Sequence, residues 1–169
     1  MEDRSNSSSE PTSDFESGIN DDDLIDLRVW LRLLTCTHLI ERRVRRNLRS
    51  EFQTTLPRFD VLAQIARSPE GQPMRELSQR LMVTNGNITP LVDRLVEDGL
   101  VIREPSTDDR RVQHVKLTNT GEQALDGMIP KHKDWVSDLM RDMNRSQATA
   151  LYTLLGQLKN SILNSDKRR

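Results

Sequence analysis

The side chains with the most distinctive chemistry lie between residues 84 and 111. One stretch carries polar groups that can hydrogen-bond to bases or phosphates: Thr84, Asn85, Asn87, Thr89 and Arg94. Asn can pair with adenine through two hydrogen bonds, Thr can contact the methyl group of thymine, and Arg can bind guanine or a phosphate. A second stretch is the triplet Asp109-Arg110-Arg111, and its arginines are suited to a narrow, electronegative minor groove. We expect the two asparagines and Thr89 to contact bases, and Arg94 to contact the DNA backbone.

A helix-turn-helix is predicted to position the first stretch. Leu77 and Leu81 are four residues apart, which gives a short helical segment one apolar edge. Thr84 follows as a helix cap, with its side-chain oxygen accepting a backbone N–H. The second helix has an apolar stripe and stops at a glycine: Ile88, Leu91, Val92 and Leu95, then Gly99. Pro90 removes one helical hydrogen bond, so this helix either starts late, near Asn87, or kinks.

Two short strands follow the second helix. They are predicted over residues 101–103 and 112–117, which are rich in β-branched side chains, and a charged, turn-forming loop over residues 105–111 joins them. We interpret this hairpin as a wing rather than an ordinary solvated hairpin, because helix, turn, helix and hairpin come in the order of a winged helix. Met74 is expected to form the short strand that pairs with the wing. The predicted fold class is mainly α with a small β-wing.

The wing carries a family resemblance. Asp109-Arg110-Arg111, five further residues and Leu117-Thr118 resemble the D-[RK]-R-x5-L-T signature of MarR-type transcription regulators. Residues 91–101 are similar to that family's stretch from recognition helix to wing, and the resemblance extends from about residue 24 to residue 163. It implies a homodimeric winged-helix protein whose affinity for double-stranded DNA is changed by a small ligand or by thiol oxidation. It also implies that Arg111 enters the minor groove and that Asp109 holds it in place.

The composition is typical of one soluble, helix-rich domain. The chain has 169 residues, of which 30% are charged and 4% aromatic. No apolar run approaches the length that spans a membrane, and the N-terminus is acidic rather than signal-like. We therefore expect a cytoplasmic protein with no membrane partner. The single cysteine, Cys36, cannot form an internal disulfide.

The net charge of −1 conceals an uneven distribution. Residues 1–23 hold eight acidic side chains and one basic, whereas residues 24–169 hold 24 basic and 18 acidic, a net charge of +6. A dimer of the second part would carry twice that charge, which suits a phosphate backbone. The acidic tail, residues 1–20, lacks apolar periodicity and is expected to be disordered. Solubilisation is its simpler role, and weak competition with DNA for the basic face is the alternative.

Long amphipathic helices are predicted on both sides of the winged helix. The first starts with three aspartates, near its positive dipole end, and is apolar on two sides. Thr118 is predicted to cap a helix over residues 119–143 that Pro130 kinks or divides, and Ser146 to cap a last helix. Self-association through these helices is the economical inference. The predicted boundaries are 21–165 for a single domain, 21–50 and 119–165 for its dimerisation helices, and 55–118 for its winged helix-turn-helix lobe.

The resemblance also implies an effector cavity between the two lobes. Its expected ligand-binding residues come from the first two helices: Trp30, His38, Arg42, Arg46, Arg58 and Phe59. Residues 55–61 and 85–87 are similar to the branch of the family that senses aromatic acids as CoA thioesters, such as hydroxycinnamoyl-CoA, and the arginines would hold the CoA phosphates. Considered from the residues alone, Trp30 and Phe59 are predicted to belong to the core rather than to bind a ligand, and His38 is predicted to be a buried, hydrogen-bonded histidine.

These features predict a regulator, most simply a repressor of an aromatic-compound catabolic or efflux operon. A small aromatic acid or its CoA thioester would release it from a pseudo-palindromic operator. An enzyme is not predicted, since the sequence has no phosphate-binding glycine loop, nucleophile elbow or metal-ligand spacing, and no cofactor is expected. One alternative is a redox-sensing repressor that uses Cys36, although its apolar neighbours favour an inert, buried thiol. Another is a constitutive DNA-binding protein without an effector.

Overall fold

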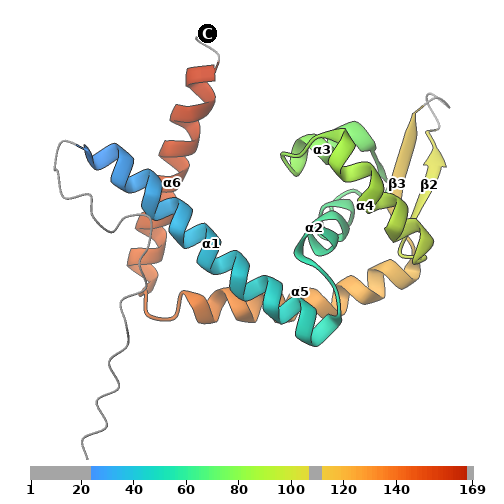
Figure 1. Cartoon of the computed structure of the whole chain (residues 1–169), viewed down its shortest axis with the longest axis horizontal. Helices are drawn as coiled ribbons and strands as arrows, with labels where there is room; N and C mark the ends of the chain where they lie inside the picture. The colour runs from blue at the N-terminus through green and yellow to red at the C-terminus, as the bar shows by residue number, and fades with distance from the viewer. Residues whose placement is uncertain (1–23, 107–111, 167–169) are drawn as a thin grey trace, which may run out of the picture. The chain divides into compact units, whose positions relative to one another are not determined.

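The computed structural model describes residues 24–106 and 112–166 (Figure 1). Over these residues the chain is mainly helical with one small antiparallel sheet, as predicted. The chain divides into two compact units, residues 1–43 and residues 44–169, and the boundary falls within α1. The elements in chain order are α1 (Ile25–Phe52), α2 (Leu56–Ile65), β1 (Gln72–Pro73), α3 (Met74–Arg80), α4 (Asn85–Glu97), β2 (Val101–Pro105), β3 (Gln113–Leu117), α5 (Asn119–Leu139) and α6 (Arg145–Asp166).

The described part of the first unit is the N-terminal portion of α1. Many of its apolar side chains are exposed in the single chain: Leu24, Ile25, Leu27, Val29, Trp30 and Leu39. Cys36 and His38 are exposed as well, so the burial predicted for both is wrong for the single chain, and so is the core role predicted for Trp30. α1 ends at Phe52 rather than at residue 50, and the start predicted at residue 21 lies outside the described residues.

The second unit is built around an apolar core. The buried apolar side chains come from α1 to α5 and from two strands: Val44, Leu48, Leu56, Phe59, Val61, Leu62, Ile65, Leu77, Ile88, Val92, Leu95, Val101, Val115, Leu125 and Met128. Full burial of one side chain of this size contributes roughly 1.5–3 kcal/mol. Within its described residues, α6 contributes no buried side chain to this core. The end of α1, the winged helix and the first half of α5 therefore form the core of the second unit.

The helix-turn-helix has the predicted order, with two differences in detail. α4 begins at Asn85, so it does not start late, and Pro90 lies within it. Thr84 occupies the N-cap as predicted, but its side chain makes no cap hydrogen bond. Its carbonyl oxygen instead accepts the N–H groups of Asn87 and Ile88, at 3.0 and 3.2 Å. Backbone groups thus close the first turn without help from the threonine hydroxyl.

The wing is an antiparallel hairpin with a third, shorter strand beside it. β2 and β3 pair along their whole length, with Arg103 opposite Val115 at the centre, which confirms both predicted strands. The order in the sheet is β1-β3-β2. β1 lies at Gln72–Pro73, whereas Met74, which was predicted to form this strand, is the first residue of α3. Pro73 explains the difference, because its extended backbone (φ −62°, ψ 147°) suits a strand residue at a helix N-cap.

One junction joins α4, both strands of the wing and α5. Thr118 is the N-cap of α5, as predicted: its oxygen accepts the N–H of Gly121 at 3.0 Å, and its O–H donates to the carbonyl of Gly99 at 2.7 Å. Gly99 has a φ of +70°, a conformation that glycine adopts without strain. A Cβ added at Gly121 would lie 2.0 Å from the carbonyl oxygen of Leu100. The start of α5 can approach the strand this closely because residue 121 has no side chain.

The two C-terminal helices differ in part from the predicted ones. α5 continues through Pro130 without dividing, and it ends at Leu139 rather than at residue 143. Asn144 caps α6, where Ser146 was predicted to do so. The Asn144 side chain accepts the N–H of Gln147, and the Gln147 side chain accepts the N–H of Asn144, both at 2.9 Å. This reciprocal capping box needs Gln three residues after the cap, a spacing that Asn144 has and Ser146 lacks.

An aromatic cluster links the end of α1, α2 and α5. The rings of Phe59 and His132 lie 4.8 Å apart, those of His132 and Trp135 6.5 Å, and those of Phe52 and Trp135 6.1 Å. Burial lowers the pKa of the His132 imidazole below its ordinary value. The folded chain therefore favours the neutral ring at this position.

Substitution of Gly121 tests the junction at the start of α5. We expect Gly121→Ala to lower the free energy of unfolding by about 1–3 kcal/mol or more, because the added methyl group overlaps the Leu100 carbonyl. Gly127→Ala on the same helix is the matched control, since its Cβ would meet Phe52 at an ordinary 3.9 Å. Urea unfolding of both variants measures the difference, and equal stabilities would show that the close approach does not exist.

The shifted pKa of His132 makes stability depend on pH. The His132 imidazole takes up a proton more readily in the unfolded chain than in the folded one. Its contribution to the free energy of unfolding is therefore complete at neutral pH, and it is lost as the pH falls below the ordinary histidine pKa of about 6.5. Between about pH 7 and pH 5.5, the free energy of unfolding should fall more in the wild type than in His132→Phe. The same decrease in both proteins would assign the pH dependence to other groups.

Candidate nucleic-acid interface

The polar residues predicted to contact DNA lie together on the exposed side of α4. Thr84, Asn85, Asn87, Thr89 and Arg94 are all exposed. Ile88, Val92 and Leu95 on the opposite side are at most 1% exposed and pack into the core. Gly86 and Pro90 lie among the polar residues and are also exposed. Because neither has a long side chain, the helix surface between the longer polar side chains is free of bulky groups. The 3.6-residue period of the helix thus sorts this sequence into one buried and one accessible side.

Thr89 has a local hydrogen bond that limits what it can offer a base. Its hydroxyl donates to the carbonyl oxygen of Asn85 at 2.8 Å. That carbonyl belongs to the preceding turn of the helix, so the bond turns the Thr89 oxygen towards the backbone. The methyl group of Thr89 is left for apolar contact, as the thymine interaction predicted from the sequence requires.

Two ion pairs fix the position of α4 in the winged helix. A carboxylate oxygen of Asp93 lies 2.6 Å from the guanidinium of Arg103 on β2. At the end of α4, Asp98 pairs with Arg58 of α2 at 2.5 Å. Both pairs are partly exposed, so each contributes little stability but defines geometry. They tie the recognition helix to the wing on one side and to α2 on the other.

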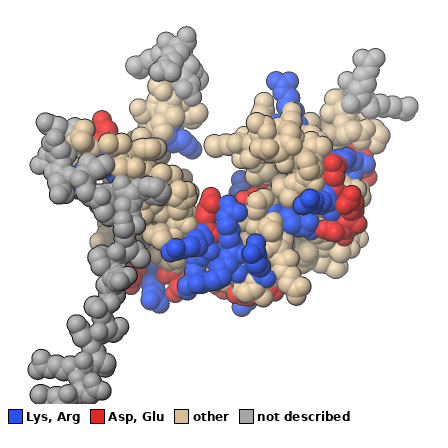
Figure 2. Space-filling model, viewed as in Figure 1, with Lys and Arg blue, Asp and Glu red and all other residues tan. Residues whose placement is uncertain are grey.

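The charged side chains on this lobe are mixed in sign. Figure 2 shows Lys and Arg beside Asp and Glu around the sheet, and a separate group of Lys and Arg over the second half of α1. Lys116 and Glu104 form a further ion pair across the wing at 3.0 Å. Arg94 is exposed and has no ion pair with any described residue. Among the predicted DNA-binding residues of α4, it is the one that can supply an uncompensated positive charge.

The triplet Asp109-Arg110-Arg111 lies outside the described residues. The structure defines the hairpin on both sides of it: β2 ends at Pro105, and β3 begins at Gln113. The N–H of Ser106 donates to the carbonyl of Val112 at 2.8 Å, which closes the last described pair of the hairpin. The predicted minor-groove residues therefore belong to the connection between the two strands of the wing.

The residues predicted to bind an effector are distributed over both units. Trp30, His38 and Arg42 belong to the first unit, whereas Arg46, Arg58 and Phe59 belong to the second. Phe59 is 5% exposed and packs against His132, which confirms the core role predicted for it from the residues alone. Arg58 is engaged with Asp98, a partner 40 residues away in the sequence. Sequence reasoning missed this pair because no local pattern links the two positions.

The described ranges contain neither a metal-binding cluster nor a membrane-spanning helix. No group of three or more His, Cys, Asp or Glu side chains there could hold a metal ion. None of the helices in those ranges is long and apolar enough to cross a membrane.

Known proteins resemble this chain in sequence and structure. The MarR family matches residues 54–112. An uncharacterised HTH-type transcriptional regulator of Bacillus cereus is 30% identical over 135 residues, covering 79% of this chain and 88% of that protein. A MarR family transcriptional regulator from Silicibacter pomeroyi is 30% identical with a TM-score of 0.72, covering 85% of this chain and 99% of that one. A mutant of MarR from E. coli in complex with operator DNA is 25% identical with a TM-score of 0.73, covering 82% and 99%.

The likeness is not confined to a shared DNA-binding motif. The Bacillus and Silicibacter relatives are matched along nearly their whole lengths, and the E. coli relative was solved on its operator. This chain belongs to the MarR family of winged helix-turn-helix transcription regulators: it is a DNA-binding regulator and not an enzyme.

Proposed function

We propose that this regulator is a homodimeric repressor that binds a pseudo-palindromic operator and is released by a small ligand. The exposed polar side of α4 carries the proposal. In each subunit α4 would enter a major groove, and the connection between β2 and β3 would reach the flanking minor groove. Asn85, Asn87 and Thr89 would contact bases, and Arg94 a phosphate. Arg110 and Arg111 would enter the minor groove, with Asp109 holding Arg111 in place.

Exposed apolar side chains support self-association. α6 carries leucines and isoleucines on a surface with no core beneath it, and Leu151, Leu155, Leu158 and Ile162 are 37–55% exposed. The N-terminal portion of α1 carries a similar set within its own unit. Large exposed apolar surfaces of this kind favour a protein partner, and a second copy of the chain is the simplest one. A dimer would present two recognition helices and so require two half-sites in the DNA.

The proposed effector is a small aromatic acid or its CoA thioester. Trp30, His38, Arg42 and Arg46 are exposed side chains of α1, and the two arginines could bind a carboxylate or phosphate groups. Release from DNA requires that the ligand bind a conformation with the wrong spacing of the two α4 helices more tightly than the DNA-bound one. The residues of α2 are less suited to this role, because Phe59 is buried and Arg58 is paired.

The exposure of Cys36 favours a second candidate mechanism. The thiol is accessible in the single chain rather than buried. An accessible thiol can be oxidised to a sulfenic acid or a disulfide, which would alter α1 and could release the protein from DNA. A redox-sensing repressor is therefore the alternative to a ligand-responsive one.

Alanine substitutions test the DNA-binding surface. We expect Arg111→Ala to weaken operator binding about tenfold or more without affecting the dimer, because it removes a minor-groove contact. Asn87→Ala should cost about 1–3 kcal/mol on the cognate operator and less on a variant operator, because a base contact is lost. Arg141→Ala, far from α4 in the sequence and exposed, is the control. Titrations monitored by fluorescence anisotropy measure all three, and unchanged affinities for Arg111→Ala and Asn87→Ala would exclude this surface.

A DNA mobility-shift titration separates the two release mechanisms. The protein on its own upstream promoter DNA is titrated with an aromatic acid, its CoA thioester and, separately, hydrogen peroxide. We expect the thioester or the acid to release the DNA, and Arg42→Ala/Arg46→Ala to weaken that response while leaving DNA binding intact. Release by peroxide that disappears in Cys36→Ser would instead identify the thiol as the sensor. Stable binding under all three conditions would indicate a constitutive DNA-binding protein.

A further inference from the structure

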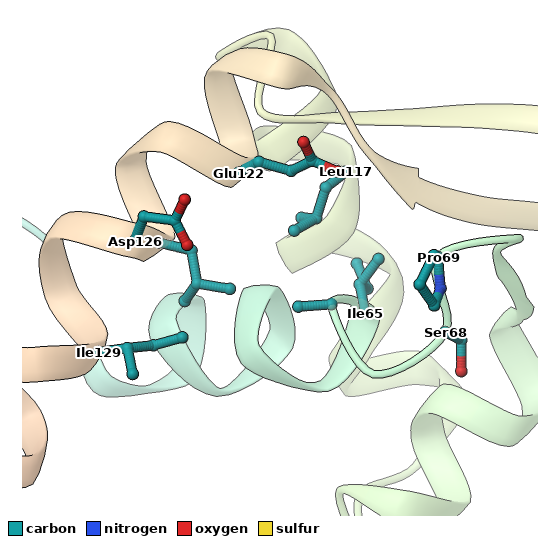
Figure 3. A pocket seen from close by; sticks show the side chains of 9 residues that line it. Ile65, Ser68, Pro69, Leu117, Glu122, Asp126 and Ile129 are labelled. Atoms are coloured by element: carbon teal, nitrogen blue, oxygen red, sulfur yellow. The ribbon is translucent and has the colours of Figure 1, made fainter.

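A hollow that the proposed function does not use lies in the second unit (Figure 3). It has a volume of about 240 Å³ and opens between the end of α2, the loop that follows, the end of β3 and the first half of α5. This volume lies below the usual range of small-molecule sites, roughly 300 to 1,000 Å³, so the hollow suits only a compact ligand. Its lining residues are Ile65, Ala66, Ser68, Pro69, Leu117, Glu122, Leu125, Asp126 and Ile129.

The base of the hollow is apolar. Ile65 and Leu125 are 1% and 2% exposed, so they belong to the core as well as to the lining. Ile129 is 45% exposed and extends over the hollow from α5, opposite Ile65 and Pro69 (Figure 3). The Ser68 hydroxyl points away from the hollow in this view. A compact apolar group would therefore find apolar contacts on two sides.

Two carboxylates stand on one wall of this apolar hollow. Glu122 and Asp126 are four residues apart on α5, so they lie on the same side of the helix. Glu122 extends along the rim towards Leu117 (Figure 3). Neither carboxylate forms an ion pair with a residue in the described part of the chain. Two like charges at this spacing repel each other, and only Glu122 lies in the first turn, where the helix dipole favours an acidic side chain.

We infer that this hollow binds a small organic cation, with an ammonium or amidinium group on the carboxylates and a compact apolar body on Ile65, Leu125 and Ile129. The charge-assisted hydrogen bonds would involve Glu122 and Asp126. The same carboxylates repel an anion, so an aromatic acid or a CoA thioester does not fit here. A metal ion does not fit either, because two carboxylates above an apolar base leave most of its coordination unsatisfied. This site is thus additional to the effector proposed for α1.

The hollow is connected to the DNA-binding surface through the residues at the start of α5. Leu117 is the last residue of β3, and Thr118 next to it connects α5 to Gly99 at the end of α4. A molecule that contacts Leu117 and α5 at once therefore bears on the base of the wing. A bound cation would change the DNA affinity only through this contact with the wing. Binding of the cation to the hollow does not require DNA.

Calorimetric titration of the full-length protein without DNA tests the site directly. The probe is 2-phenylethylammonium, with 3-phenylpropionate as an anion of similar shape, methylammonium as a cation without an apolar body, and Mg²⁺ as a metal ion. We expect measurable binding of the first probe alone. Glu122→Gln/Asp126→Asn should weaken it about tenfold or more by removing the charge-assisted bonds. Asp134→Asn, exposed on the same helix outside the hollow, is the matched control.

A second variant tests the shape of the hollow without changing its charge. Ala66→Leu adds an apolar side chain at the exposed C-cap of α2, where the backbone is helical, and should reduce binding by filling the space. Thermal unfolding confirms that each variant is folded. The inference is overturned by a lack of 2-phenylethylammonium binding, by equal binding of the anion, methylammonium or Mg²⁺, or by unchanged affinity in the carboxylate or Ala66 variants. Since DNA is absent, these outcomes do not depend on the proposed repressor function.

Discussion

The close approach of α5 to the start of the wing is the constraint on which the rest of the second unit depends. The missing side chain at Gly121 lets the helix start against the Leu100 carbonyl, and Thr118 bonds to the backbone at both Gly99 and Gly121. These contacts join the end of the recognition helix, both strands of the wing and the long helix that follows. Since several elements meet within a few residues, a change at any of them would alter the angle between α4 and the wing.

Ion pairs add further contacts between α4 and its neighbours. Asp93 binds Arg103 of the wing, and Asp98 binds Arg58 of α2. In most regulators a basic surface faces DNA, but here much of the positive charge on the winged helix is already neutralised by neighbouring carboxylates. Affinity for DNA would then depend on a few uncompensated cations, with Arg94 as the one on α4. The polar side chains of the recognition helix would contribute mainly to sequence specificity.

The two ends of the chain have a different physical character from the winged helix. The first unit and α6 expose leucine, isoleucine and tryptophan side chains that a single chain leaves in water. The exposure of Cys36 shows that apolar neighbours in the sequence do not by themselves bury a residue. Such an apolar surface favours association, and in the proposed dimer this association would contribute to the stability of each subunit.

The sequence by itself determined the helix-turn-helix, the wing and the cap at Thr118, because these follow from local periodicity, β-branched runs and capping chemistry. It also predicted which side of α4 is exposed, since Ile88 and its apolar neighbours define the buried side. Only the tertiary structure decided the pairing of Arg58 with Asp98 and the need for glycine at residue 121. It also revealed the hollow beside Glu122. Such features depend on residues far apart in the chain, and no local pattern encodes their distance.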